Sequence, residues 1–302
     1  MGISAKITVN EYTQLAGHKQ GVYAIIQLRG GEILSSGGDG SVVRWNPLNK
    51  DPKGVLFAQL PEPVFCLLEH LDGSIWAGTQ AGNLFVLERG QKPRVLNFEK
   101  KGIYFLTPDF LGNVWLGFGD GYLIMLNREL QIIRQVEISD KSLRCMKPMV
   151  QNLSRPDTDR FFLGSSDGIL RKLQADGDVL QCVNANSPSI FAICYLHDGM
   201  LITGGRDAQL QGFDANLNPI IEHIKAHLYT IHAIEYNNEG LIATGSMDST
   251  IKLWDKDLHL LKVIDRSKLP TAHRHSVNTL LWLSPEILVS AGDDSIIRVW
   301  QL

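Results

Sequence analysis

The sequence is poor in several features that would indicate a specific chemistry. It has four cysteines, and no two of them form a C-x-x-C pair, so neither disulfides nor a metal site built on thiolates is indicated. Its formal net charge is -3, and no cluster of Lys and Arg offsets it, which argues against a nucleic-acid partner. No apolar run approaches the length of a membrane span, so we expect no membrane segment.

The four cysteines also indicate a compartment. Cys66, Cys145, Cys182 and Cys194 lie inside apolar, strand-like runs, where a free cysteine usually acts as a small hydrophobic residue. We therefore expect buried thiols in a reducing compartment. The first residues lack the apolar region of a secretory signal, and we expect a cytoplasmic protein.

The chain also lacks the 3.6-residue periodicity of amphipathic helices, and short runs rich in β-branched residues take its place. Residues 226–255 show the unit most clearly, with three such runs separated by residues 237–240 and by the turn Met247-Asp248-Ser249. Runs punctuated by Asn, Gly and Asp are typical of antiparallel strands joined by tight turns. Three strands alone would leave an apolar face unburied, so the unit requires copies of itself.

The turn aspartate Asp248 marks these copies. Equivalent positions recur at intervals of 39 to 47 residues, at Asp39, Ala81, Asp120, Asp167, Asp207, Asp248 and Asp294. A strand-like run ends just before each position and another begins just after it. Outer, fourth strands are predicted at residues 54–60, 94–98, 132–138, 179–183, 219–225 and 260–264. Seven such units predict an all-β, seven-bladed β-propeller of four-stranded antiparallel blades.

The seventh unit has no fourth strand after its third, because Leu302 follows directly. An extra strand-like run at residues 6–15 comes before the first unit. If this N-terminal strand pairs with the last blade, the ring closes and no long sheet edge is left exposed. We expect residues 1–302 to form this single closed propeller, as a monomer.

Three of the units contain the same four polar residue types, and in each a His precedes the turn Asp by 21 residues. Gly17-His18 with Trp45, Ala226-His227 with Trp254-Asp255, and Ala272-His273 with Trp300 resemble the GH…WD signature of the WD-repeat β-propeller family. The resemblance implies three hydrogen-bonded tetrads, made by His18, Ser35, Asp39 and Trp45, by His227, Thr244, Asp248 and Trp254, and by His273, Ser290, Asp294 and Trp300. Units two to five lack the His and depart from this pattern.

The same residue types allow a catalytic interpretation. Ser, His and Asp can form a hydrolytic triad, but a set that recurs in three blades and includes an indole N–H is better explained as structural, since a buried Trp N–H needs an acceptor. His273-Arg274-His275 suggests a metal site, yet no Cys or acidic ligands accompany it. We expect no metal, no cofactor and no enzymatic activity.

The resemblance also identifies a candidate binding face. In the family, the second residue of each innermost strand and the residue before each turn Asp point toward the top rim of the central channel. The partner-binding residues predicted in this way are Tyr23, Phe65, Tyr104, Arg144, Phe191, Arg206, His232 and Met247. Exposed aromatic and Arg side chains contribute much of the energy at interfaces. The alternative is that some of these rings pack between blades.

The sequence thus predicts a non-catalytic protein-interaction scaffold that binds a peptide segment or a partner domain on its top face. Two alternatives stay open, namely a small-molecule sensor or enzyme that uses the axial mouth, and one propeller of a larger multi-propeller scaffold. An enzyme would need converging acids, bases or metal ligands in the mouth. The rim positions offer only His232, Arg144, Arg206 and Asp293, from four different units.

Overall fold

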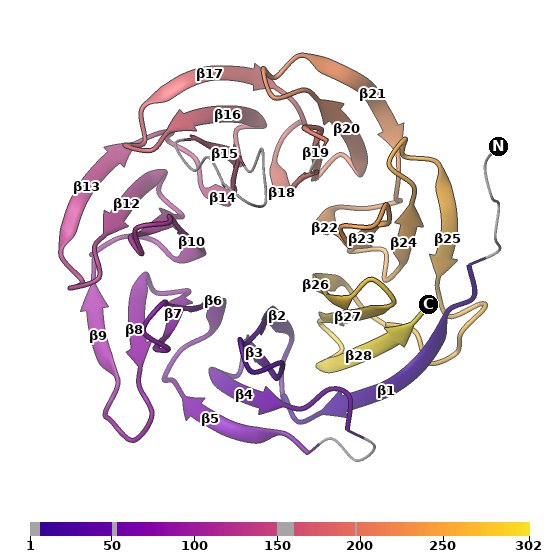
Figure 1. Ribbon diagram of the computed structural model, residues 1–302, viewed down its shortest axis with the longest axis horizontal. Helices are drawn as coiled ribbons and strands as arrows, with labels where there is room; N and C mark the ends of the chain where they lie inside the picture. The colour runs from indigo at the N-terminus through magenta and orange to yellow at the C-terminus, as the bar shows by residue number, and fades with distance from the viewer. Residues whose placement is uncertain (1–6, 50–52, 150–159, 197) are drawn as a thin grey trace.

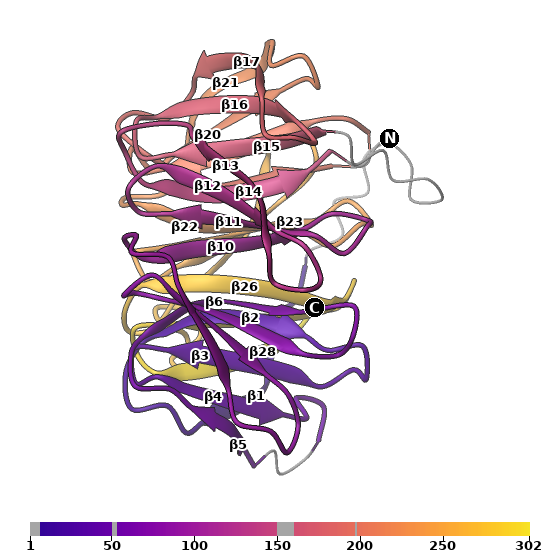
Figure 2. The ribbon, with the colours of Figure 1, turned by 90° about the vertical axis from the view of Figure 1, so that its left-hand side faces the viewer.

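The computed structural model describes residues 7–49, 53–149, 160–196 and 198–302. These residues form seven four-stranded antiparallel sheets arranged in a ring (Figure 1). Figure 2 shows the ring from its side, with the strands of each sheet running between two opposite faces. Among the described residues, no helix is long and apolar enough to cross a membrane. The predicted seven-bladed, all-β propeller is confirmed.

In the first six blades the strands follow chain order from the centre of the ring outward. Blade one is β2 (Val22–Gln27), β3 (Ile33–Gly37), β4 (Ser41–Trp45) and β5 (Val55–Gln59). Blade two is β6 (Val64–Glu69), β7 (Ile75–Thr79), β8 (Asn83–Leu87) and β9 (Arg94–Asn97). Blade three is β10 (Ile103–Pro108), β11 (Val114–Phe118), β12 (Tyr122–Leu126) and β13 (Ile132–Glu137).

The same order continues around the ring. Blade four is β14 (Leu143–Pro148), β15 (Arg160–Ser165), β16 (Ile169–Gln174) and β17 (Val179–Asn184). Blade five is β18 (Ile190–Tyr195), β19 (Leu201–Gly205), β20 (Gln209–Phe213) and β21 (Pro219–Lys225). Blade six is β22 (Ile231–Tyr236), β23 (Ile242–Ser246), β24 (Ile251–Trp254) and β25 (Leu260–Ile264).

Blade seven joins the two ends of the chain. Its inner strands are β26 (Val277–Ser284), β27 (Ile287–Gly292) and β28 (Ile296–Gln301), and β1 (Asn10–Ala16) pairs antiparallel with β28 as the outer strand (Figure 1). The predicted closure of the ring is therefore confirmed. The strand predicted at residues 6–15 begins later and ends one residue later than expected, and Lys6 lies outside the described residues.

The core lies between the blades. The second strands β3, β7, β11, β19 and β23 are buried along their whole length, because each blade is covered on both sides by its neighbours. Small residues allow this close packing. A Cβ at Gly117, for example, would overlap the ring of Phe105. The outer strands are largely exposed, which explains one wrong prediction: Cys182, on β17, is exposed, whereas Cys66 and Cys194 are buried as expected and Cys145 is partly buried.

Candidate protein-interaction face

The three predicted tetrads are present as hydrogen-bonded sets. In blade one, His18 Nε2 lies 2.7 Å from Ser35 Oγ, His18 Nδ1 lies 3.2 Å from the carboxylate of Asp39, and Trp45 Nε1 donates to Ser35 Oγ over 2.8 Å. An indole N–H can only donate and a carboxylate can only accept, so the bonds run from Trp to Ser to His to Asp. The corresponding distances are 2.7, 3.0 and 2.9 Å for His227, Thr244, Asp248 and Trp254, and 2.8, 3.0 and 2.8 Å for His273, Ser290, Asp294 and Trp300.

The tetrad hydroxyls cannot act as nucleophiles on a substrate. Ser35, Thr244 and Ser290 are fully buried, and each already accepts the indole N–H of its own blade. A bound substrate carbonyl would have no access to them. The structure therefore supports the structural interpretation of the three Ser/Thr-His-Asp sets over the hydrolytic one.

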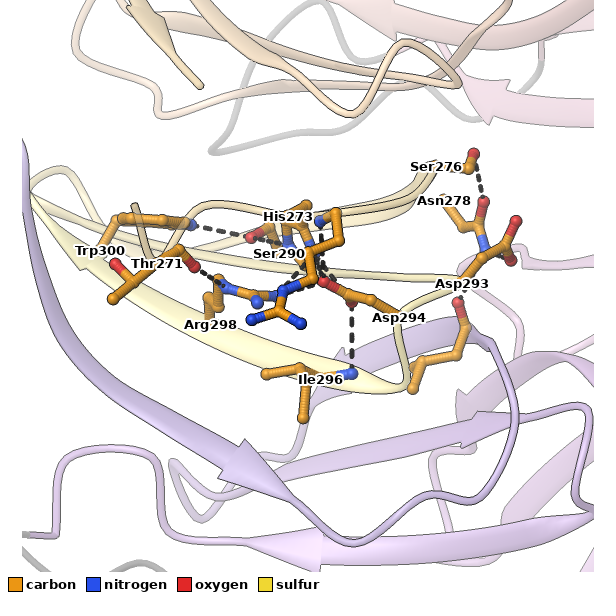
Figure 3. Close-up of polar contacts among 12 residues, drawn as sticks. Thr271, His273, Ser276, Asn278, Ser290, Asp293, Asp294, Ile296, Arg298 and Trp300 are labelled. Carbon is orange, nitrogen blue, oxygen red and sulfur yellow. Dashed lines mark hydrogen bonds and ion pairs between the residues drawn. The ribbon is translucent and has the colours of Figure 1, made fainter. Parts of the chain in front are cut away.

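The tetrad of blade seven includes a cation that the sequence did not indicate (Figure 3). One terminal nitrogen of Arg298 lies 2.8 Å from Asp294 Oδ2, and both side chains are only 5% exposed. Burial alone would raise the pKa of Asp294, but its hydrogen bond to His273 and the charge of Arg298 outweigh this effect, so the pKa is lowered. Burial also lowers the pKa of His273, so the imidazole is held neutral beside an ionised carboxylate.

Blades without the His use other donors for the turn aspartate. In blade four, Arg171 donates to Asp167 over 2.6 Å and also to Ser165. In blade five, Asn186 Nδ2 donates to Asp207 over 3.1 Å, and Asn186 precedes Asp207 by 21 residues, the spacing of the tetrad His. That spacing was a signal from which the role of Asn186 could have been predicted.

The predicted rim residues of the innermost strands share one backbone feature. Each innermost strand has a β-bulge after its first residue, so that Val22 pairs with Gly37 and Ala24 with Ser36, while Tyr23 has no partner in the ladder. A bulge turns its extra residue away from the regular alternation of the sheet. The bulged residues are Tyr23, Phe65, Tyr104, Arg144, Phe191, His232 and Asn278.

Six of these side chains form a continuous chain of ring contacts, which we call the mouth belt: Tyr23, Phe65, Tyr104, Arg144, Phe191 and His232. Tyr23 meets Phe65 edge-on at 5.6 Å between ring centroids, and Phe65 stacks on Tyr104 at 5.4 Å. The guanidinium of Arg144 lies 4.3 Å from the ring of Tyr104 and 5.0 Å from that of Phe191. Phe191 then meets His232 edge-on at 5.5 Å.

The side chains of the mouth belt fit both predictions made from the sequence, exposure at the rim and packing between blades. All six of its side chains are half-buried, because each contacts its neighbours in adjacent blades. Tyr23, Phe65, Tyr104 and Arg144 also line a cavity of about 360 Å³ along the inner strands of the first four blades. The rings are thus both packed between blades and open to the axial mouth, and burial lowers the pKa of the one titratable imidazole in the belt, His232.

The loops that enter each innermost strand and the turns between the second and third strands lie at one end of the blades, which we call the top face. A second pocket opens on this face. It has a volume of about 400 Å³ and lies over blades three to five. Its charged lining residues are Lys101, Asp140, Lys141, Arg144 and Arg206. Arg144 belongs to both the belt and this pocket.

The predicted turn residues Arg206 and Met247 are exposed on the top face. Met247 is 55% exposed and is joined by two residues that the sequence reasoning missed, Leu228 at 77% and Tyr229 at 61% exposed. The backbone N–H of Met247 donates to Thr230, and Ser246 Oγ donates to the carbonyl of Tyr229. An apolar pair directly after the tetrad His227 was the signal that could have revealed this patch.

Comparison with known proteins agrees with the geometry. The family model described as WD domain, G-beta repeat matches residues 10–46, 219–255 and 266–301, the three segments that contain the complete tetrads. The structure is similar to the crystal structure of the WD40 β-propeller domain of Doa1, with a TM-score of 0.82, 17% sequence identity and 97% of each chain covered. At this identity the similarity shows the fold and not a shared partner. The chain matches no curated protein sequence. It is a seven-bladed β-propeller in which three of the seven blades match the WD40 repeat.

Proposed function

We propose that this propeller is a non-catalytic protein-interaction scaffold whose top face binds a peptide segment or a partner domain. The observation that supports this most directly is the mouth belt, an unbroken series of aromatic and Arg contacts across six blades. Aromatic and Arg side chains are enriched among the hot-spot residues that contribute most of the binding energy of protein interfaces. Because the belt residues already hold one another in place, a ligand would lose little free energy by ordering them.

The chemistry of the channel favours a scaffold over an enzyme. Burial raises the pKa of the Cys66, Cys145 and Cys194 thiols to about 12, so none of them is a thiolate nucleophile at neutral pH. Glu235, whose carboxylate lies 3.2 Å from Lys147 Nζ, raises the pKa of Lys147, which keeps that amine protonated and unsuited as a base.

One group of potential metal ligands occurs in the described residues, at Asp255, Asp257 and His259. It lies in the turn between β24 and β25, away from the top face. Asp255 accepts hydrogen bonds from the backbone N–H groups of Asp257 and His259, so the turn itself explains why the three residues are close together. The unpaired cysteines lead us to propose a reducing compartment such as the cytoplasm.

The experiment compares two half-buried tyrosines on innermost strands. Tyr104 lies at the top end of β10, whereas Tyr195 lies at the opposite end of β18, against Phe162. Replacing either by Ala should cost similar stability, about 2–3 kcal/mol, since each removes a partly buried ring. Only Tyr104→Ala should lose the partner.

The binding measurement is affinity capture from the source cell, followed by crosslinking mass spectrometry. Crosslinks from the partner are expected at Lys101 and Lys141, which line the top pocket. Thermal melts of both variants provide the stability control. Retention of the partner by Tyr104→Ala, or an equal loss with Tyr195→Ala, would contradict binding at the top face.

A further inference from the structure

We propose that the ligand of the top face is an acidic peptide segment with an apolar side chain next to its carboxylates, bound across blades three to six. This inference rests on the proposed function and specifies the chemistry of its partner. It follows from two neighbouring surfaces of opposite character, a basic pocket over blades three to five and an exposed apolar patch on blade six.

The pocket has an excess of positive charge. Four cationic side chains line it, and the one carboxylate among them, Asp140, lies 3.0 Å from Lys141. Within the described parts of the chain, no ion pair or side-chain hydrogen bond involves Lys101 or Arg206. The whole chain has a net charge of -3, so this local excess is a property of the pocket and not of the protein as a whole. Such a pocket attracts carboxylates.

Arg144 is held ready to bind a carboxylate at the inner wall of the pocket. Its guanidinium carbon lies over the ring of Tyr104 and over the ring of Phe191, and its Nε donates to Ser166 Oγ over 2.7 Å. These contacts hold the guanidinium in place, while its terminal N–H groups make no hydrogen bond to other described residues. Because the edge of a guanidinium is the part that binds carboxylates in a bidentate manner, the group is preorganised for an acidic ligand.

The apolar patch is adjacent to the pocket. It consists of Leu228, Tyr229 and Met247, which are 77%, 61% and 55% exposed. The loop that contains Leu228 is joined to the turn that contains Arg206, because the backbone N–H groups of residues 226 and 227 both donate to the carbonyl of Ala208. One short extended segment could therefore place carboxylates in the pocket and an apolar side chain on the patch.

The charges on the rest of the top face determine where an acidic ligand can bind. On blade seven the corresponding turn presents Asp293, which is exposed and accepts a hydrogen bond from Asn278 over 2.7 Å. An acidic segment would be repelled there and attracted over blades three to five. The cations come from separate loops, before β10, before β14 and after β19, so they suit several spaced carboxylates better than a single phosphate group.

The test is a selection of random displayed peptides on the immobilised full-length protein, with binding of the winning peptides then measured by fluorescence anisotropy. We expect peptides with two or more Asp or Glu residues and a neighbouring Leu, Ile or Phe. Arg206→Glu should weaken their binding about 10- to 100-fold, the loss expected for a charged hydrogen bond. Added salt should weaken binding as well.

Two matched controls keep the test specific. Arg89→Glu makes the same charge change at an exposed residue of the turn between β8 and β9, at the other end of the blades. Leu111→Ala removes a leucine that is 71% exposed at that end, beside Leu228→Ala on the patch. The controls should leave binding unchanged, whereas Leu228→Ala should lower the affinity several-fold. Equal losses in the controls would overturn the proposal.

The remaining outcomes separate this inference from the proposed function. Winning peptides that need Tyr104 but contain no acidic residues would leave the proposed function standing and overturn the acidic ligand. A winning peptide that binds as well when its acids are replaced by alanines and one phosphoserine would assign the pocket to phosphate and also overturn it. If the wild-type protein selects no peptide, the acidic-segment proposal fails, whereas the proposed function fails only if capture of a partner does not depend on Tyr104.

Discussion

Removal of the Asp294 carboxylate should be the most destabilising change at any turn aspartate of this propeller. Asp294 accepts hydrogen bonds from His273 and Arg298 (Figure 3) and from the backbone N–H of Arg274. With Asp294→Ala, the guanidinium of Arg298 would stay buried without its counter-ion. Removing one partner of a buried ion pair typically costs about 3–5 kcal/mol. Because Arg298 keeps its hydrogen bond to the carbonyl of Thr271, we expect the lower end of this range, about 3 kcal/mol.

Two other aspartates provide the scale for this value. Asp248 is equally buried in its tetrad but has no Arg partner, so Asp248→Ala should cost about 1–3 kcal/mol, the usual penalty for unpaired buried polar groups. Asp120 has only a Lys100 ammonium at 3.9 Å and no His or Trp partner, and Asp120→Ala should cost less than about 1 kcal/mol. The expected order of destabilisation is Asp294, Asp248, Asp120.

Urea unfolding followed by tryptophan fluorescence measures these differences, provided that the m-values stay constant. The double variant Asp294→Ala/Arg298→Ala should lose less stability than the two single variants added together, because the second change removes the stranded charge. An additive cycle, or equal midpoints for Asp294→Ala and Asp120→Ala, would refute the assignment of Arg298 and Asp294 as a coupled buried pair.

Three further predictions follow from the same contacts. Burial alone would raise the pKa of Asp167, but hydrogen bonds from Arg171 and Ser165 lower it to about 2. Because this carboxylate and those of the tetrads stay ionised in the folded state, urea midpoints should fall as the pH drops from about 4 to about 2, where the carboxylates of the unfolded chain bind protons. Urea midpoints that do not change with pH would be inconsistent with these hydrogen bonds. In the folded protein, a thiol reagent should modify Cys182 first and the partly buried Cys145 more slowly, with Cys66 and Cys194 reacting only in denaturant. Rapid reaction of Cys66 or Cys194 would contradict their burial. Deletion of residues 1–15 should give a largely unfolded chain, because it removes most of β1 from the edge of β28; a soluble deletion variant with a cooperative thermal transition would show that closure does not depend on β1.

The fold could be predicted from the sequence because its signals are local and repeated. Each turn aspartate is flanked by two short β-branched runs, and seven such units leave one arrangement that buries every sheet. Even the outer strands were predicted closely, since β21 and β25 have the predicted bounds and β17 is one residue longer than predicted. The pairing of β1 with the last blade could be predicted because the last blade would otherwise have an exposed sheet edge.

The candidate site could be predicted only in part, because its contacts join residues about 40 positions apart in different blades. The rim positions were identified, but the bulge at Tyr104 and its contacts with Phe65 and Arg144 depend on backbone geometry that no local pattern encodes. Lys101 and Lys141 were missed because nothing in the sequence shows that their loops border one pocket. Cys182 was predicted wrongly, because its apolar neighbours do not reveal that β17, as an outer strand, is exposed along almost its whole length.

The distribution of the tetrads suggests how the ring combines closure with binding. Complete tetrads occur in blades one, six and seven, around the junction where β1 must find β28. In these blades the turn aspartate also accepts a backbone N–H from the entering loop, as Asp248 does from Leu228. The same carboxylate that stabilises blade six therefore holds the exposed apolar loop in place, which reduces the entropy that the loop would lose on binding. Blades three and four lack the tetrad His, and their entering loops instead present Lys101 and Lys141 to the pocket. Rigid apolar contacts on one side and long cationic side chains on the other would let one segment dock in a fixed register while its carboxylates adjust.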